Sequence, residues 1–208
     1  MAISVLIADD HALYRSGLRQ LLADELDATV IREAATFDDV VAVLTEEAHD
    51  LVLVDLNMPG MSGAETLAAL RDAFPSARVA VVSATEERSE IFAALAAGVH
   101  GFVPKSLPAA EIVKALQAVC EGRIFVPATI GQRGGQTAAQ PTKPAISLET
   151  LTHRQKDVLS QLVKGKSSKE IARALDIAEG TVKIHLAAIY RTLGVRTRAE
   201  AIAKLSAQ

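Results

Sequence analysis

The feature that most constrains the fold is a repeated alternation of short apolar runs and helical patterns over the first 127 residues. Three of the runs are nearly continuous in Val, Ile, Leu or Ala rather than strictly alternating, so their strands are expected to be covered on both faces. With right-handed crossovers, this pattern predicts an α/β doubly wound five-stranded parallel sheet. The runs are SVLIA (4–8), TVIREA (29–34), LVLV (51–54), RVAVVSA (78–84) and GFVP (101–104), and the expected helices are residues 11–24, 37–47, 63–74, 86–97 and 108–121.

The composition fits such a sheet and narrows the compartment. Only 3% of the residues are aromatic and Trp is absent, so the interior must be built from Ala, Leu, Val and Ile. The single cysteine, Cys120, cannot form an internal disulfide, which favours a reducing compartment. The first residues lack the basic start of a signal peptide, and no apolar run approaches the ~18 residues of a membrane-spanning helix. We therefore expect a cytoplasmic protein without a membrane partner.

Charge divides the chain more sharply than its net value of -3 suggests. Residues 1–127 carry 19 acidic and 9 basic side chains, a net charge of -10, whereas residues 148–208 carry 6 acidic and 11 basic ones, a net charge of +5. Residues 128–147 are rich in Gly, Gln, Thr and Pro and offer little to bury, which is typical of a flexible linker. The sequence therefore predicts two domains, and the basic one is expected to meet a polyanion.

The basic domain has a purely helical pattern. Gly165 and Gly194 stand where helices are expected to end. Two of the helices are separated by the short turn DIAEG, which indicates a helix-turn-helix with a core at 168–187, although a plain helical hairpin has the same pattern. The positive charge favours the DNA-binding interpretation. Capping boxes are expected at Thr152 with Gln155, Ser167 with Glu170, and Thr197 with Glu200, and the four helices are predicted over 152–164, 167–175, 180–193 and 197–206.

Polar residues stand at or just after the ends of four predicted strands. They are Asp9, Asp10, Asp55, Ser83 and Lys105, and all are expected at the carboxyl edge of the sheet, where ligands bind. Three carboxylates in one cleft stay ionised together only with a compensating cation, and their oxygen ligands favour Mg²⁺. Each residue taken singly also fits an ordinary role, because Asp forms turns and caps helices, and a lysine is often a solvated surface charge.

Residues 3–121 resemble the receiver domain of response regulators, which has a flavodoxin-like fold. The resemblance rests on the pair Asp9 and Asp10 and on the segments VDLNMPGMSG, VVSA and GFVPK, which follow the family's order and spacing. It implies that Asp55 is the phosphoacceptor and that Asp10, Asp55 and the backbone carbonyl of Asn57 hold Mg²⁺, with Asp9 acting through its water. It also implies a histidine kinase as the donor. The protein would then not be an enzyme, but would assist its own phosphorylation and dephosphorylation.

The same resemblance assigns phosphoryl binding and switching to Ser83, Phe102 and Lys105. Lys105 would neutralise charge on the transferring group, Ser83 would bind a phosphoryl oxygen, and Phe102 would turn inward as Ser83 moves. Without the resemblance, Phe102 fits an ordinary core aromatic. Ser106 stands where many receivers have proline, so a cis bond is not assumed. The expected helix at 86–97 is unusually apolar, and is either buried or the face of a homodimer formed on phosphorylation.

Residues 148–208 resemble the four-helix DNA-binding domain of the NarL/FixJ and LuxR regulators over nearly their whole length. This implies a dimer bound to an inverted-repeat DNA site. Ala178 and Ala187 depart from the Thr and the polar or basic residue common at these places, so the recognition helix has a weaker cap and Ala187 could make only apolar contact. His185 also fits a packed helix position. Carried over by position, Lys183, Ile184 and Ala187 face the bases, Lys169, Thr181, His185 and Arg191 lie near phosphates, and Ala199, Ile202 and Leu205 form the dimer face.

Together these features predict a two-component response regulator, a transcription factor controlled by phosphorylation of Asp55, with RNA polymerase as a further conceivable partner. Two rivals stay open. The first is an enzyme, a Mg²⁺-dependent phosphohydrolase, which would need an acid two residues after its nucleophile, where this chain has Asn57. A nucleotide-binding domain has less support, because no G-x-G-x-x-G follows the first strand. A regulator that binds DNA without phosphorylation would keep full activity in cells as Asp55→Asn.

Overall fold

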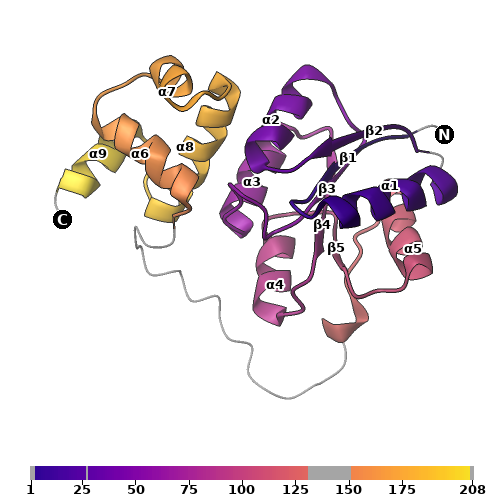
Figure 1. The fold of residues 1–208 in the computed structure, drawn as a ribbon. Coiled ribbons are helices and arrows are strands. Elements are labelled where there is room, and N and C mark those ends of the chain that lie inside the picture. Colours follow the sequence, from indigo (N-terminus) through magenta and orange to yellow (C-terminus); the bar gives the residue numbers. More distant parts are fainter. Residues whose placement is uncertain (1–2, 27, 131–150, 207–208) are drawn as a thin grey trace. The chain divides into compact units, whose positions relative to one another are not determined.

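The computed structural model describes residues 3–26, 28–130 and 151–206, which Figure 1 draws as a ribbon. The contacts between residues divide the chain into two compact units, residues 1–133 and 134–208. The first unit holds a parallel sheet and the second is helical. Within the described ranges, no helix combines the length and the apolar character that crossing a bilayer requires.

The first unit has the doubly wound architecture that the apolar runs predict. Its strands are β1 (Ile3–Ala8), β2 (Ala28–Ala34), β3 (Leu51–Val54), β4 (Arg78–Ser83) and β5 (Gly101–Pro104), and its helices are α1 (Ala12–Glu25), α2 (Phe37–Glu46), α3 (Ala64–Ala73), α4 (Arg88–Ala96) and α5 (Ala109–Cys120). The five described strands are all parallel, in the order β2, β1, β3, β4, β5. Helices α1 and α5 cover one face of the sheet, and α2, α3 and α4 cover the other (Figure 1).

Burial on both faces explains the continuous apolar runs of the central strands. Ile7 and Leu53 belong to a core cluster that also contains Leu116 of α5. Successive strand residues point to opposite faces, so Leu6 and Val52 face the other helical layer, and both are fully buried. A polar side chain at any of these positions would be buried away from water by one of the two helical layers. The alternation of apolar and polar residues is therefore absent from β1 and β3.

Helix α4, for which burial and an exposed contact face were both expected, combines the two. Ile91 and Ala94 are buried, whereas Phe92 is 51% exposed. The helix therefore packs one side against the sheet and carries an exposed aromatic on another.

The chain beyond α5 returns along the outer edge of β5, a feature that the sequence pattern did not predict. The Phe125 N–H donates to the His100 carbonyl over 3.1 Å, and the Phe125 carbonyl accepts from the Phe102 N–H over 3.0 Å. Residue 125 thereby forms a parallel bridge with Gly101. A Cβ on Gly101 would lie 2.9 Å from Cγ2 of Val119, so glycine allows α5 and this segment to approach the strand closely.

Residues 128–130, which the sequence assigns to the linker, form a short 3-10 helix, η1 (Ala128–Ile130). Arg88, the first residue of α4, donates from Nη2 to the Ile130 carbonyl over 3.2 Å. The first unit therefore includes residue 130, because a side chain of that unit contacts its carbonyl. Residues 131–147 of the predicted linker lie outside the described residues.

The second unit contains the predicted helices, α6 (His153–Val163), α7 (Ser168–Leu175), α8 (Glu179–Leu193) and α9 (Arg198–Ser206). Their core includes Leu162, Ile171, Val182 and Ile189. The capping boxes at Thr152 and Ser167 are confirmed in both directions. As the sequence suggests, Ala178 offers no side-chain cap to α8.

The third predicted box forms only in part. The Glu200 N–H donates to Oγ1 of Thr197 over 3.2 Å, but the Glu200 carboxylate accepts from the Arg196 N–H over 2.8 Å. The return bond thus comes from the residue before the expected cap, because the chain entering α9 presents that N–H to the carboxylate.

Several basic side chains of the second unit cap the carboxyl ends of its helices. Arg154 donates to the Leu175 carbonyl over 3.2 Å, and Lys204 donates to the Leu193 carbonyl over 2.7 Å. Arg198 donates to the carbonyls of Leu162 and Lys166, over 3.0 and 2.7 Å. The last carbonyls of a helix have no amide donor from a following helical turn. Part of the positive charge attributed to nucleic-acid binding therefore stabilises the fold.

Candidate functional site

The carboxyl ends of β1, β3, β4 and β5 bring the predicted site residues together. Ala8 of β1 pairs with Val54 of β3, so the residues that follow them, Asp9 and Asp55, are neighbours. The Asp55 N–H donates to the Ala8 carbonyl over 2.8 Å. On the other side, the Lys105 N–H donates to the Ser83 carbonyl over 2.8 Å. Strand register thus explains why residues distant in sequence share one edge.

Lys105 joins the two buried carboxylates. Its Nζ lies 2.6 Å from Oδ2 of Asp9 and 2.9 Å from Oδ2 of Asp55. Asp9 is 2% exposed and Asp55 is 1% exposed. Burial acts to lower the pKa of Lys105, but its hydrogen bonds and charge interactions with the two carboxylates outweigh burial and raise that pKa. The ammonium therefore stays charged and partly neutralises the site.

The second oxygen of Asp55 makes the site suitable for a cation. Within the described residues, Oδ1 of Asp55 is buried and has no hydrogen-bond partner. One potential ligand atom from each of Asp9, Asp10, His11 and Asp55 lies within 4.8 Å of the others. A buried carboxylate oxygen without a donor is costly, and a hard divalent ion such as Mg²⁺ satisfies several such oxygens at once. The residues therefore fit the metal that the sequence predicts.

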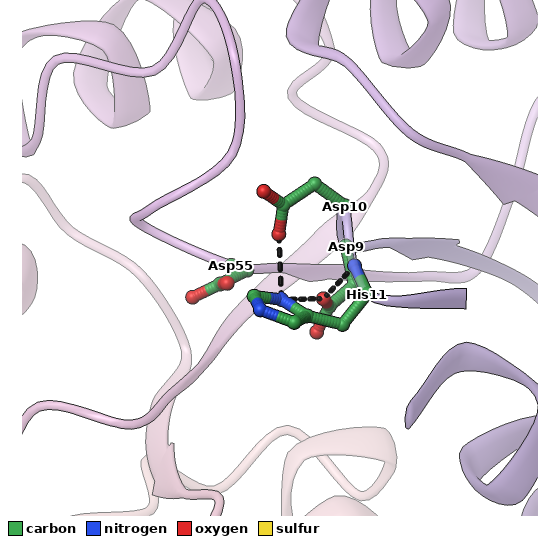
Figure 2. A group of neighbouring side chains, drawn as sticks. All are labelled: Asp9, Asp10, His11 and Asp55. Carbon is green, nitrogen blue, oxygen red and sulfur yellow. Dashed lines mark hydrogen bonds and ion pairs between the residues drawn. The ribbon is translucent and has the colours of Figure 1, made fainter. Parts of the chain in front are cut away.

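His11 is a member of this cluster that the sequence interpretation missed. Its Nδ1 lies 2.7 Å from Oδ1 of Asp10 and 3.2 Å from Oδ1 of Asp9, and its backbone N–H donates to the same Asp9 oxygen over 2.8 Å. Figure 2 shows the imidazole between the two carboxylates. The available signal was its position directly after the acidic pair, at the start of the predicted helix.

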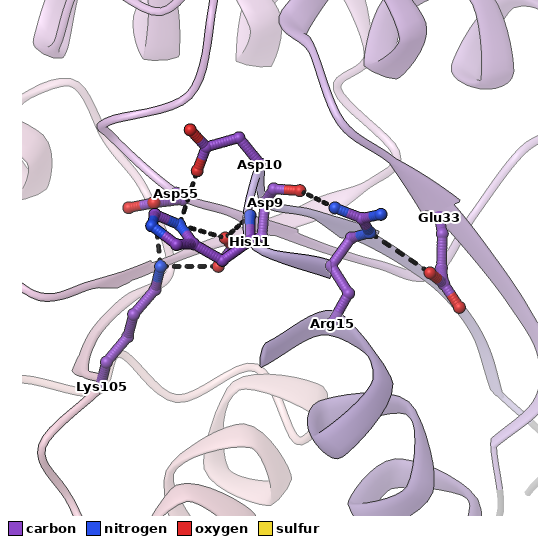
Figure 3. A network of polar contacts seen from close by, with 7 residues as sticks. All are labelled: Asp9, Asp10, His11, Arg15, Glu33, Asp55 and Lys105. Carbon is purple, nitrogen blue, oxygen red and sulfur yellow. Dashed lines mark hydrogen bonds and ion pairs between the residues drawn. The ribbon is translucent and has the colours of Figure 1, made fainter. Parts of the chain in front are cut away.

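A second contact network fixes the backbone at Asp9, directly after β1 (Figure 3). Arg15 of α1 donates from Nη1 to the Asp9 carbonyl over 2.6 Å, and its Nε lies 3.3 Å from Oε2 of Glu33 on β2. Arg19, one helical turn further, pairs with the other oxygen of Glu33 over 3.1 Å. None of these three residues was predicted as part of the site, because their partners become neighbours only when β1, β2 and α1 pack.

Tyr14 adds an aromatic contact beside the carboxylates. Nζ of Lys105 lies 4.8 Å from the centroid of the Tyr14 ring, a cation–π distance. Burial, then the charges of Asp9 and Asp55, raise the pKa of Tyr14 to about 12. Its hydroxyl is buried and has no hydrogen-bond partner among the residues that the structure describes. The ring thus holds the ammonium from one side while the carboxylates hold it from another.

The loop after β3 is fixed locally. Gly60 has a φ of +90°, and a Cβ at this position would lie 2.9 Å from Cβ of Phe37. The Phe37 N–H donates to the Pro59 carbonyl over 2.9 Å, which ties the loop to the start of α2. Asn57 lies in this loop and is exposed. Its expected role as a carbonyl ligand stays a prediction.

The predicted switch residues occupy buried positions. Ser83 is fully buried at the end of β4, and its Oγ accepts from the Thr85 N–H over 3.4 Å. Phe102 is also fully buried, so its ring is already inward in this structure. Ser106 donates to a carboxylate oxygen of Glu86 over 2.6 Å, linking the loops after β5 and β4. No cis peptide bond occurs in the described residues.

The predicted DNA contacts divide into exposed and buried side chains. Lys169, Lys183 and Arg191 are exposed, and Nζ of Lys183 lies 2.9 Å from Oε1 of Glu179. Ala187 is half-buried. Thr181, Ile184 and His185 are buried. The expected contacts of all these residues with DNA stay predictions.

The predicted dimer face on α9 is only partly exposed. Ala199 is exposed and Ile202 is half-buried. Leu205 packs against the helical core, in which Ala201 is fully buried. Leu205 lies one helical turn after Ala201 and therefore shares its inward side. The three predicted residues do not form one exposed apolar stripe in this structure.

Fold and site together define the class of protein: a receiver domain joined to a helix-turn-helix domain. Residues 5–117 match the response regulator receiver domain, and residues 149–205 match the bacterial regulatory proteins of the luxR family. The glycerol metabolism activator of Pseudomonas putida is 36% identical over 205 residues, which cover 95% of this chain and 92% of that protein. The nitrate/nitrite response regulator protein NarL of Escherichia coli K12 is 32% identical over 199 residues, covering 95% and 92%. The chain therefore belongs to the response regulators that carry a LuxR-type DNA-binding domain.

Solved structures agree with this fold. Response regulator ChrA of a heme-sensing two-component system is 32% identical, with a TM-score of 0.53 over 100% of this chain and 98% of that one. RcsB of Salmonella typhimurium is 23% identical, with a TM-score of 0.59 over 100% and 99%. The RcsB likeness concerns the fold.

Proposed function

We propose that this response regulator is phosphorylated on Asp55 by a histidine kinase, with Mg²⁺ as cofactor, and that phosphorylation controls its binding to DNA. The observation that carries the proposal is the state of the two Asp55 oxygens. Oδ2 is 2.9 Å from the Lys105 ammonium, whereas Oδ1 has no hydrogen-bond donor in the described part of the chain. Oδ1 would therefore bind the metal ion, and Oδ2 would attack phosphorus once the Lys105 ammonium turns to the phosphoryl group.

Each neighbouring group has a distinct task in this proposal. Asp9, Asp10, Asp55 and the carbonyl of Asn57 would hold Mg²⁺, which neutralises charge on a transferring phosphoryl group. Lys105 would neutralise charge on the phosphoryl oxygens, because its ammonium already lies beside the Asp9 and Asp55 carboxylates. These groups would assist the phosphorylation of Asp55 and the later hydrolysis of its phosphoryl group. The protein would thus act on itself and not as an enzyme on another substrate.

A groove beside the site offers the donor a path. It has a volume of about 770 Å³ and extends from Lys105 along α1, with Tyr14, Leu21 and Ile112 in its lining. Leu13 lies at the groove and is 88% exposed. A contiguous apolar groove at the surface is typical of a protein contact surface, so we assign kinase docking to this face.

The phosphorylation test uses an acyl phosphate with Mg²⁺, followed by intact mass. The full-length protein should gain one phosphoryl group, and Asp55→Asn should gain none. Asp157→Asn removes an exposed carboxylate of α6 and is the matched control, which should be phosphorylated normally. Modification of Asp55→Asn to the same extent as the natural protein would contradict the proposal.

We further propose that phosphorylation promotes a homodimer that binds an inverted-repeat DNA site. The exposed Lys169, Lys183 and Arg191 lie on α7 and α8, which correspond to the helix pair of helix-turn-helix proteins, whose second helix enters the major groove. Ile184, Ala187, Thr181 and His185 of α8 would join them at the DNA, and Ala199, Ile202 and Leu205 of α9 would contribute to the dimer. RNA polymerase would be a further partner at the promoter. Transcription in vitro with and without the phosphorylated protein tests this interaction.

Lys183 provides the sharpest test of this DNA interface. Lys183→Ala should weaken operator binding, relax sequence preference and reduce the salt dependence by about 0.9 in log–log slope if one phosphate contact is lost. Lys156→Ala on α6, also exposed, should leave the slope unchanged. Equal affinity of Lys183→Ala and the natural protein for the operator would refute the role of Lys183.

A further inference from the structure

We propose that His11 is a nitrogen ligand of the metal site and gives it a preference for late first-row transition ions such as Co²⁺ over Mg²⁺. The inference rests on the metal site of the proposed function. It concerns a residue to which neither that proposal nor the family resemblance gives a role. It predicts which class of divalent ion the site selects.

The geometry of the imidazole points to this role. Nδ1 of His11 lies 2.7 Å from a carboxylate oxygen of Asp10 and 3.2 Å from one of Asp9. The imidazole nitrogen thus already lies among the oxygens that would surround the ion, and the ligand atoms of the cluster lie within 4.8 Å of one another. A small movement of this side chain, which is 68% exposed, would exchange its contacts with the carboxylates for a bond to a shared cation.

A separate observation indicates that the cluster is built for a ligand. Asp55 is 1% exposed, and within the described residues its Oδ1 has no donor. The Lys105 ammonium contacts Oδ2 of both Asp9 and Asp55 and leaves this oxygen unsatisfied. A cation between Asp55, Asp10 and His11 would satisfy it.

The ligand set determines the selectivity. Mg²⁺ prefers oxygen ligands and keeps several of its waters, so an added imidazole contributes little to its affinity. Imidazole favours the later first-row ions, whose affinities also rise along the series from Mn²⁺ to Cu²⁺. His11 should therefore strengthen binding of Co²⁺ much more than binding of Mg²⁺.

Calorimetric titration of the full-length protein with Co²⁺ and with Mg²⁺ tests the inference. His11→Ala should lower Co²⁺ affinity by at least about tenfold, the lower range for losing a residue that supports a metal ligand, and should change Mg²⁺ affinity far less. The visible absorption of bound Co²⁺ should also change when the nitrogen ligand is lost. His153→Ala removes an exposed histidine of α6 and is the matched control, and Asp10→Asn should weaken both ions.

The outcomes separate this inference from the proposed function. If His11→Ala leaves Co²⁺ affinity and spectrum unchanged, His11 is not a ligand, although Mg²⁺ binding stands. Binding of Co²⁺ that Asp10→Asn does not affect would place the ion elsewhere and overturn the inference. If the natural protein binds neither ion, both this inference and the metal part of the proposed function fail.

Discussion

Arg15 holds the backbone carbonyl of Asp9, with 2.6 Å between Nη1 and the oxygen, while Lys105 holds the Asp9 carboxylate over 2.6 Å. Arg15 lies in the first turn of α1 and Asp9 follows β1 directly. Two cations therefore fix the same aspartate through its two different oxygen groups. Glu33 keeps the Arg15 guanidinium in place from the neighbouring strand.

Replacing Arg15 should loosen this turn. Arg15→Leu is expected to lower the free energy of unfolding of the first unit by about 1–3 kcal/mol, because the Asp9 carbonyl loses a charged donor. The side chain of Arg15 is 16% exposed, whereas that of Arg19 is 54% exposed and pairs with Glu33. Arg19→Leu is thus a matched control with a smaller expected effect. Urea unfolding measures both, and equal losses would contradict the role given to the carbonyl contact.

Removing the ammonium of Lys105 should make the protein depend on divalent ions for stability. Lys105→Met leaves Asp9 and Asp55 buried without their shared cation, and breaking a buried ion pair costs about 3–5 kcal/mol. Mg²⁺ should restore part of that loss, so adding it should raise the melting temperature more in Lys105→Met than in the natural protein. Thermal unfolding with Mg²⁺ and with a chelator measures the difference. The same Mg²⁺ response in both proteins would count against a shared site.

Tyr14 predicts a specific alkaline behaviour. Its pKa is raised from 10.0 to about 12, so between these values the unfolded chain releases a proton that the folded state retains. Unfolding therefore becomes more favourable as pH rises through this window, and the contribution of Tyr14 is fully present only below pH 10.

Tyr14→Phe should lose less stability across that window than the natural protein. Comparing the two also removes the shared effect of Lys105, which loses its proton in the alkaline range. Tyrosinate absorbance provides the direct measurement, because the signal that disappears in Tyr14→Phe should be the one near pH 12. If the lost signal titrates near pH 10, the hydroxyl is not in the environment described.

Arg198 should affect stability, in contrast with Lys183. Arg198 donates to the carbonyl of Leu162 in the last turn of α6 and to that of Lys166 between α6 and α7, so Arg198→Leu is expected to destabilise the second unit by about 1–3 kcal/mol. Under conditions where the protein stays folded, its affinity for DNA should fall less than that of Lys183→Ala. Chemical unfolding and DNA titration of both variants separate the two roles. A larger loss of DNA affinity in Arg198→Leu would assign its guanidinium to the DNA.

The strands and helices were predictable because burial leaves a periodic trace in sequence. LVLV at 51–54 is buried at all four positions and forms β3 with the predicted bounds. The capping boxes at Thr152 and Ser167 are local, since donor and acceptor lie three residues apart. The box at Thr197 forms only in part because its outcome depends on how the chain enters α9.

Contacts between distant segments left no such trace. The bridge between Gly101 and Phe125 joins β5 to a segment that follows a complete helix. Arg15 and Glu33 resemble ordinary surface charges in the sequence, and only the packing of α1 beside β2 brings them together. The net positive charge of the second domain can be counted in the sequence, but not which side chains are available for DNA. Arg154, Arg198 and Lys204 instead donate to carbonyls at helix ends.

The sequence by itself determined the parallel sheet, the helical second domain and the presence of Asp9, Asp10, Asp55 and Lys105 at one edge, because strand periodicity and strand ends follow from local composition. Only the tertiary structure decided that Lys105 joins Asp9 to Asp55, that Oδ1 of Asp55 lacks a donor among the described residues, and that His11 lies between two carboxylates. The reason is that hydrogen bonding depends on distances of a few tenths of an ångström, which are set when the separate strand ends and α1 pack together.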